Sequence, residues 1–401
     1  MERNKLIVKY LVIQIFVLVT TFISVNVSAA ESAGVPIGNG QLYPQLDIKL
    51  QHDDNLLRAN TGEIDTFVSI FSPQLLYQIE SNKSLMLFEY VMDTAEHFSS
   101  HNDDYVDNRA RAEFEYEPTS RIFTAVRGEF VDTRDPRGTG ASEGAQVAIL
   151  SPDFYHSFGV LGEMRYGAKT AKGRFEFDVG YKDKNYDTNR QTTFVRDRDD
   201  FYGSARFLYR ILPKTNLLFE TRAINFNYEQ DAVGTAGLDS TTFKYLAGVT
   251  WDATYKTTGY AKLGLIEKKF DSSARADGDA LLWELGVEWQ PRTYSTFSLS
   301  TQRDFTETNG IGDFIEENSV NAGWKHEWPG NLISSINYTF SRNDYASLRE
   351  DDKNTLSLKL DYKMRRWFTV GVGYTYDERD SNNSNFNYER NIFELTAVIT
   401  L

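Results

Sequence analysis

The chain has 401 residues, no cysteine, 23 tyrosines, 27 phenylalanines and a formal net charge of -14. This acidic balance argues against a nucleic-acid-binding protein, because the phosphate backbone attracts basic surfaces. An exported chain without cysteine also takes no stability from disulfides. No apolar run after residue 30 is long enough to cross a bilayer as a helix, which takes about 20 residues. Aromatic residues are spread along the whole chain and favour β-structure.

The first 30 residues have the composition of a secretion signal. Arg3, Lys5 and Lys9 form a basic start, residues 10–23 are mostly apolar, and small residues lead up to Ala30. This order predicts a signal peptide over residues 1–30 that is cleaved after export. A short periplasmic segment is expected over residues 31–41. No composition shift marks a further domain, so residues 42–401 are predicted to form one unit.

From residue 42 onward, apolar and polar residues alternate with a period of two. In Val106–Tyr116 the alanines and aromatics share one face and the charged residues share the other, and Leu281–Trp289 and Thr355–Met364 follow the same rule. A period of two indicates β-strands with one apolar and one polar face. About 18 strands are predicted, with cores at 42–52, 66–79, 85–97, 105–116, 121–132, 154–167, 172–183, 200–211, 216–228, 240–252, 257–269, 280–290, 293–304, 315–327, 331–341, 353–364, 367–377 and 389–401. Sixteen strands are the alternative, because residues 145–152 could extend a strand or fold inward.

The connections between these strands alternate between short and long. Four short connections carry a proline, namely Pro118, Pro213, Pro291 and Pro329, which ends the ladder and presets the turn. The long connections are rich in Asp, Asn, Gly and Ser. The strands, at 11 or more residues, are longer than the 5–6 residues usual in a sandwich. We therefore predict an all-β fold: a transmembrane antiparallel β-barrel over residues 42–401, with short periplasmic turns and long extracellular loops.

Five of the six tryptophans lie at or beside the short turns. Their amphipathic rings prefer the headgroup level of a membrane, so they are predicted to form an interface belt in contact with outer-membrane lipid and lipopolysaccharide. These residues are Trp251, Trp289, Trp324, Trp328 and Trp367.

The polar faces of the strands are predicted to line the lumen. Their charged residues include Arg109, Arg111, Arg127, Arg165, Arg206, Arg210, Arg222, Glu113, Glu129 and Glu163. One interpretation is a set of cross-strand ion pairs that stiffens the wall. The other is a mixed-charge channel that passes a hydrated polymer without holding it. Few aromatic residues are expected to point inward.

No catalytic, cofactor-binding or metal-ligating residue is predicted. The five histidines lie near strand ends, in loops or, at His156, on the lipid face, and none stands beside a serine and an acid as a nucleophilic site requires. The acidic stretch 102–108 could hold a divalent cation through oxygen ligands, but a solvated acidic surface is the preferred interpretation. We therefore expect a protein that is not an enzyme.

Short motifs near the N-terminus resemble a known family. The first strand runs into "LQHDDNLLRAN" at 50–60, the second contains "IFSPQLLYQIE" at 70–80, and aromatic-proline turns follow. This pattern resembles an outer-membrane β-barrel porin family associated with exopolysaccharide and capsule export clusters. The resemblance covers the mature chain. Asp53, Asp54, Asn55 and Arg58 match the motif, whose chemical role the sequence does not disclose.

The resemblance implies an outer-membrane conduit for an exopolysaccharide or capsular polysaccharide, working with a periplasmic polysaccharide-export protein. The alternative is a general diffusion porin for small hydrophilic solutes, which barrel size and acidic character alone support. A porin usually narrows its lumen with an inward loop, and residues 133–152 are the candidate for that role.

Overall fold

A computed structural model describes residues 34–145, 148–254, 256–346 and 348–401. The predicted signal peptide lies outside the described residues. Eighteen long antiparallel strands run through the described part of the chain, preceded by one short strand. Their bounds are β1 Val35–Ile37, β2 Gly40–Asp53, β3 Thr66–Glu80, β4 Ser84–His97, β5 Tyr105–Thr119, β6 Ile122–Asp135, β7 Asp153–Tyr166, β8 Gly173–Tyr186, β9 Arg198–Leu212, β10 Thr215–Tyr228, β11 Ser240–Thr254, β12 Thr257–Phe270, β13 Gly278–Arg292, β14 Ser295–Glu307, β15 Phe314–Trp328, β16 Leu332–Asp344, β17 Glu350–Arg365, β18 Phe368–Ser381 and β19 Tyr388–Thr400.

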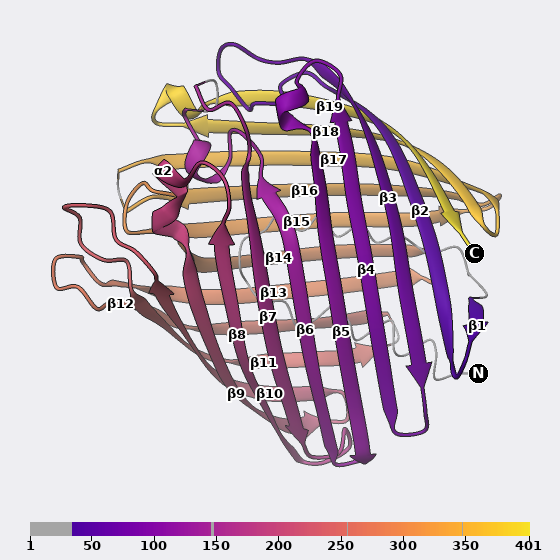
Figure 1. The fold of residues 1–401 in the computed structure, drawn as a ribbon. Helices are drawn as coiled ribbons and strands as arrows, with labels where there is room; N and C mark the ends of the chain where they lie inside the picture. Colours follow the sequence, from indigo (N-terminus) through magenta and orange to yellow (C-terminus); the bar gives the residue numbers. More distant parts are fainter. Residues whose placement is uncertain (1–33, 146–147, 255, 347) are drawn as a thin grey trace.

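Each long strand pairs with its neighbours in sequence, and β19 pairs with β2, so the sheet closes into a barrel. In Figure 1 strands β3–β6 cross in front of β13–β16, with the interior between the two walls. The barrel is predicted correctly from the sequence, down to the number of strands. The described residues of the stretch 145–152, namely 145 and 148–152, add no strand, and β7 begins at Asp153.

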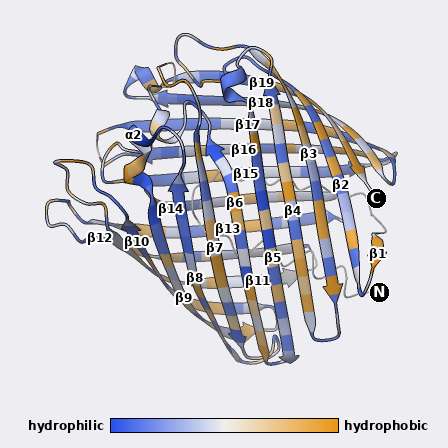
Figure 2. Cartoon of the chain, viewed as in Figure 1, coloured by the Kyte–Doolittle hydropathy of each residue, from blue (hydrophilic) through white to orange (hydrophobic). Residues whose placement is uncertain are grey.

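The strand register keeps the inner and outer faces of the sheet continuous around the whole barrel. Asp47 on β2 lies opposite Ser72 on β3 and opposite Val398 on β19, so the alternation remains in phase where the barrel closes. Figure 2 shows the resulting alternation of hydrophilic and hydrophobic residues along the strands. Large apolar side chains such as Phe71, Val179 and Leu281 are exposed on the other face, as lipid contact requires.

The four prolines of the short connections lie at or beside turns. Pro118 and Pro291 fall within shifts of the strand register, at Tyr116/Thr119 and Trp289/Arg292. Because proline has no backbone N–H, it could not donate a ladder hydrogen bond at these positions. The register shift therefore costs no hydrogen bond there. Among the described residues, no helix is long and apolar enough to span a membrane. The helical pieces are single turns within the long loops: η1 His101–Asp103, η2 Gly140–Ser142, α2 Arg190–Thr193, η3 Phe194–Arg196 and η4 Ser384–Phe386.

The topology predicts which turns reach the cell surface. Because the native chain has no cysteine, single cysteines can report position without background. Val233→Cys, in a long loop and 98% exposed, should react with an impermeant maleimide on intact cells. Thr293→Cys, in a short turn and also exposed, should react only after the outer membrane is opened. Labelling of both on intact cells would contradict this orientation.

Candidate functional site: the inner wall and extracellular mouth

The residues predicted to line the lumen share the inner face of adjacent strands. Arg111 lies opposite Glu129, Glu113 opposite Arg127, and Arg206 between Glu176 and Glu220. Directly paired residues of neighbouring strands point to the same side of a sheet. These pairs, together with the alternation along each strand, place all the predicted lumen residues on the inner face. Arg210 belongs to the same face near a short turn, opposite Asn216.

Most of these charges are paired with one another. Glu220, almost fully buried, forms ion pairs with Arg206 at 3.2 Å, with Arg222 at 2.7 Å and with Lys262 at 3.0 Å. Arg222 and Lys262 also contact Glu284, at 2.6 and 2.9 Å. This network joins β8–β10 to β12 and β13 on one wall. It corresponds to the first of the two interpretations, in which the ion pairs stiffen the barrel.

A second, smaller group of ion pairs lies on β4–β7. Arg111 and Arg127 both pair with the buried carboxylate of Glu113, the latter at 3.0 Å. Arg165 pairs with Glu163 at 2.9 Å and Arg109 with Glu89 at 3.7 Å. Together the two groups make β4–β13 a charged sector of the inner wall.

The opposite sector, β14–β18, is lined mainly by small neutral polar residues. Hydroxyl and amide side chains follow one another across these strands, with bonds such as Thr339 Oγ1 to Asn321 Oδ1 at 2.8 Å. Charged residues occur there mostly near the strand ends. The neutral set is Ser298, Ser300, Gln302, Ser319, Asn321, Gly323, Ser335, Asn337, Thr339, Ser341, Thr355, Ser357, Gly371, Gly373 and Thr375. The lumen is therefore two-sided, charged on one wall and neutral on the other.

The expectation of few inward aromatics is wrong at the extracellular end of β7–β10. Tyr155 and Tyr186 form a rung of the inner face with ring centroids 5.4 Å apart, and Phe226 and Tyr228 follow on β10. Lys184 Nζ lies 3.7 Å from the Tyr155 ring centre. Tyr155, Tyr186 and Phe226 are buried, so they pack the wall and present no open stacking surface. The alternation of inward and outward residues along each strand is enough to predict that these rings point inward.

The extracellular end of β14 folds over the inner face of its neighbours. Lys244 on β11 pairs with Asp304 at 2.6 Å, and Lys268 on β12 pairs with Glu307 at 2.5 Å. Tyr228 on β10 donates to Glu307 at 2.7 Å. These contacts pass over β13, which separates β12 from β14 in the sheet. The end of β14 therefore narrows the lumen, in addition to the loop that the sequence indicated.

The loop between β6 and β7 is described at residues 136–145 and 148–152, and its first part crosses the mouth to the other side of the barrel. Its Glu143 carboxylate accepts from Arg349 at 2.8 Å, from Arg379 on β18 at 2.7 Å and from Asn309 at 2.5 Å. All three partners lie beyond the seam, on the β14–β18 side. At the base of the loop, a Cβ on Gly138 (φ +81°) would stand 2.0 Å from the Leu57 carbonyl oxygen. Close packing at Gly138 and the ion pairs of Glu143 hold this loop across the mouth as a lid.

The charge on Glu143 is held over a wide pH range. Burial by itself would raise the pKa of Glu143, but the positive charges of Lys353, Arg379 and Arg349 outweigh burial and hold the pKa below its usual range. A lowered carboxyl pKa contributes stability above the unfolded pKa that is lost only as pH falls through the folded value. The lid should therefore stay closed at neutral pH and throughout mild acid.

Removing the Glu143 carboxylate should release the lid. Glu143→Ala leaves two nearly buried arginines without their shared partner, and the loop should leave its seat. We expect single-channel conductance in a planar bilayer to rise severalfold. Glu229→Ala, which removes an exposed carboxylate from another long loop, is the matched control and should not change it. Equal conductance of Glu143→Ala and the native protein would mean that the lid does not obstruct the pore.

The motif at 53–58 clamps the closing seam. Asp53 pairs with Arg390 on β19, with Nε–Oδ1 2.9 Å. The Asp54 carboxylate accepts from the backbone N–H of Asn391 at 2.6 Å and from its side-chain amide at 2.8 Å. Asn55 donates to the Glu389 carbonyl at 2.9 Å. Three consecutive residues at the end of β2 thus bind three consecutive residues at the start of β19, a role that the sequence alone did not disclose.

Acidic residues of the stretch 102–108 are used in ion pairs. The Asp103 carboxylate is buried against Arg137, at the base of the lid, and Asp107 pairs with Arg134 at 2.5 Å. These carboxylates are therefore neutralised by arginine and do not form an open cation site.

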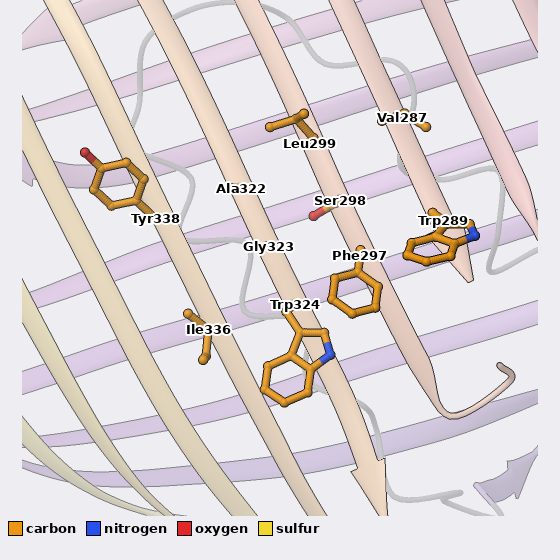
Figure 3. Close-up of a pocket in the computed structure, with 10 residues that line it drawn as sticks. All are labelled: Val287, Trp289, Phe297, Ser298, Leu299, Ala322, Gly323, Trp324, Ile336 and Tyr338. Atoms are coloured by element: carbon orange, nitrogen blue, oxygen red, sulfur yellow. The ribbon is translucent and has the colours of Figure 1, made fainter. Parts of the chain in front are cut away.

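The five tryptophans lie beside the short turns. Trp289, Trp324 and Trp328 belong to the outer face of β13 and β15, where Phe297 joins them with a ring centroid 5.4 Å from Trp289. Trp251 ends the regular ladder of β11, and Trp367 lies in the turn before β18. Figure 3 shows an apolar groove there, between Trp289, Phe297 and Trp324, floored by Ala322 and Gly323.

The closed barrel, its apolar outer face and its polar inner face define a porin-like channel protein of the bacterial outer membrane. Residues 28–401 match the family described as putative beta-barrel porin 2, and the chain belongs to that family. No curated protein matches the chain.

Solved structures with this fold are outer-membrane barrels. The chain is similar to OccK3 (OpdO) of Pseudomonas aeruginosa, with a TM-score of 0.50 and 12% identity over 90% of this chain and 96% of that one. It is equally similar to OccAB4 of Acinetobacter baumannii, with a TM-score of 0.50 and 12% identity over 93% and 100% of the two chains. At this identity the likeness concerns the fold alone.

Proposed function

We propose that this protein is an outer-membrane channel for the export of an exopolysaccharide or capsular polysaccharide. The observation that carries the proposal is the two-sided lumen, in which the neutral hydroxyl and amide sector of β14–β18 faces a wall of mutually paired charges. The resemblance of the 50–60 and 70–80 motifs to a porin family of export clusters supports the same substrate class.

A hydrated saccharide polymer suits such a wall. Its hydroxyls can exchange bonds with water for bonds with residues such as Asn321 and Thr339 at little net change in free energy, since a typical exchange is worth about 0.5–1.5 kcal/mol. On the other wall, arginines such as Arg206 and Arg222 are occupied by carboxylates. They temper the repulsion of an acidic polymer without binding it tightly.

The lid fits a conduit that is closed at rest. An unobstructed barrel of this size would leave an aqueous channel, and the Glu143 anchor keeps a loop across the mouth. A periplasmic polysaccharide-export protein is the proposed partner. The surface it would meet is the ring of short turns that carry Pro118, Pro213, Pro291 and Pro329.

The second candidate is a general diffusion porin for small hydrophilic solutes. The width of an 18-stranded barrel favours it. The inward end of β14 favours it too, because it narrows the extracellular part of the lumen and not the periplasmic part. The two functions differ in what a deletion strain loses.

Deleting the gene separates the candidates. Export predicts loss of surface polysaccharide with nearly unchanged uptake of small solutes. A strain that keeps its polysaccharide but takes up small hydrophilic solutes more slowly would overturn the export proposal and favour the porin.

Complementation can then test the neutral sector itself. Asn321→Leu with Asn337→Leu makes the centre of that wall apolar at similar volume, and it should lower polymer export several-fold while the barrel still folds. Val320→Leu, its neighbour on the lipid face, is the matched control.

A further inference from the structure

The wall of the barrel is incomplete at one place near the cell surface. Rungs between β13 and β14 stop at Trp283–Arg303, although β12–β13 pairing continues to Gly278 and β14–β15 pairing continues to Glu307. Residues 278–282 and 304–307, all described by the structure, therefore face each other across a split without ladder bonds. Unpaired backbone groups are costly at membrane depth, so a split of this kind calls for a reason.

The split reaches the apolar band of the membrane. On the outer face, Leu265 and Leu281 form a rung at 55% and 54% exposure, below the charged rung of Glu267 and Asp279. Leu281 lies eight residues above Trp289. At about 3.3 Å per residue and a tilt of about 45°, that is ~19 Å, inside an apolar band about 25 Å tall. The lower part of the split therefore adjoins the acyl chains of the outer leaflet, and its upper part adjoins the headgroups.

Apolar side chains close the split from within. Phe305 and Phe314 have ring centroids 4.6 Å apart, and they pack with the inner-face residues Leu246, Ile266 and Leu282. A Cβ on Gly278 would stand 2.4 Å from the Phe314 ring, so the ring lies directly on that backbone. The closure thus depends on side-chain packing and not on hydrogen-bonded strands.

A pocket of about 300 Å³ lies at this edge. It is lined by residues of both faces of β12 and β13, with Leu265, Ile266 and Ala280 toward the membrane centre and Lys269, Asp277 and Asp279 toward the surface. An apolar floor under a charged rim is the polarity of an outer-leaflet lipid, whose chain lies below its headgroup.

We infer that this split is a lateral site that admits the acyl chain of an outer-leaflet lipid or lipid-linked molecule to the inner side of the wall, with Phe305 and Phe314 as its closure. The site would be a second route into the barrel, from the side and independent of the polymer that passes along the axis. Its failure would leave the proposed export function standing.

The absence of native cysteines allows a direct test. Ala280→Cys places a thiol on the inner face at the split, where Ala280 pairs with Ile266. Ala95→Cys places one on the inner face at the corresponding height of β4, where Ala95 pairs on its two sides with Ile70 and Tyr105. Each variant, folded by gel mobility and reconstituted in phospholipid vesicles, is labelled with dodecylmaleimide and with a sulfonated, water-soluble maleimide.

The ratio of the labelling rate with dodecylmaleimide to that with the sulfonated maleimide corrects for differences in the general accessibility of the two thiols. We expect the dodecylmaleimide-to-sulfonated ratio to be about tenfold higher for Ala280→Cys than for Ala95→Cys. Adding Phe314→Ala should raise the ratio of the Ala280→Cys variant further and leave that of the Ala95→Cys variant unchanged. Equal ratios for the two single variants, or a ratio at position 280 that Phe314→Ala does not change, would overturn the inference.

Discussion

Arg390→Ala should destabilise the barrel strongly. Arg390 is the partner of Asp53, whose side chain is 3% exposed, at the seam between the first and last long strands. Removing one member of a buried ion pair leaves an uncompensated charge and costs about 3–5 kcal/mol. The free energy of unfolding in urea, measured in lipid vesicles, should fall by that amount.

Two further variants control this result. Arg342→Ala breaks the pair with Asp352, in which the arginine side chain is 51% exposed, and an exposed pair is worth at most about 1 kcal/mol. Arg390→Met with Asp53→Asn removes both charges and should recover part of the loss. If Arg390→Ala and Arg342→Ala cost the same, the seam clamp contributes no special stability.

Val320→Arg should also prevent or weaken folding, for a different reason. Val320 lies on the outer face of β15, four residues above the belt residue Trp324. An arginine facing lipid near mid-bilayer costs about 2–4 kcal/mol. Asn321→Arg, one residue further along the same strand, faces the lumen and should fold normally. Heat-modifiable gel migration checks both, and equal behaviour of the two variants would contradict the assignment of the two faces of β15.

Local pattern is enough to predict the barrel, because each strand must match a lipid face and a polar face on its own. The alternation in Val106–Tyr116 therefore predicts both the strand and the inward position of Arg109 and Arg111. The same alternation places Tyr155 and Tyr186 inward, but only the register between β7 and β8 shows that the two residues are paired.

Contacts between distant segments leave no such local signal. Nothing around Glu143 indicates Arg349 or Arg379, which are more than 200 residues away. Likewise, the sequence gives Asp304 and Phe305 the appearance of ordinary strand positions, and only the pairing with Lys244 and the packing on Ile266 show that the end of β14 separates from β13. The seam motif at 53–58 looks like a capped turn until its partners on β19 are known.

The position of the seam clamp also bears on how the barrel assembles. Asp53 and Arg390 are 337 positions apart, so their pairing closes almost the whole chain into a ring and carries a large loop-closure entropy. Neighbouring hairpins can form early from local contacts, whereas this pair can form only after the final strand has arrived. The contacts of Asp53, Asp54 and Asn55 thus stabilise the product of the last step of assembly. A chain that ends before β19 lacks the partners of these three residues.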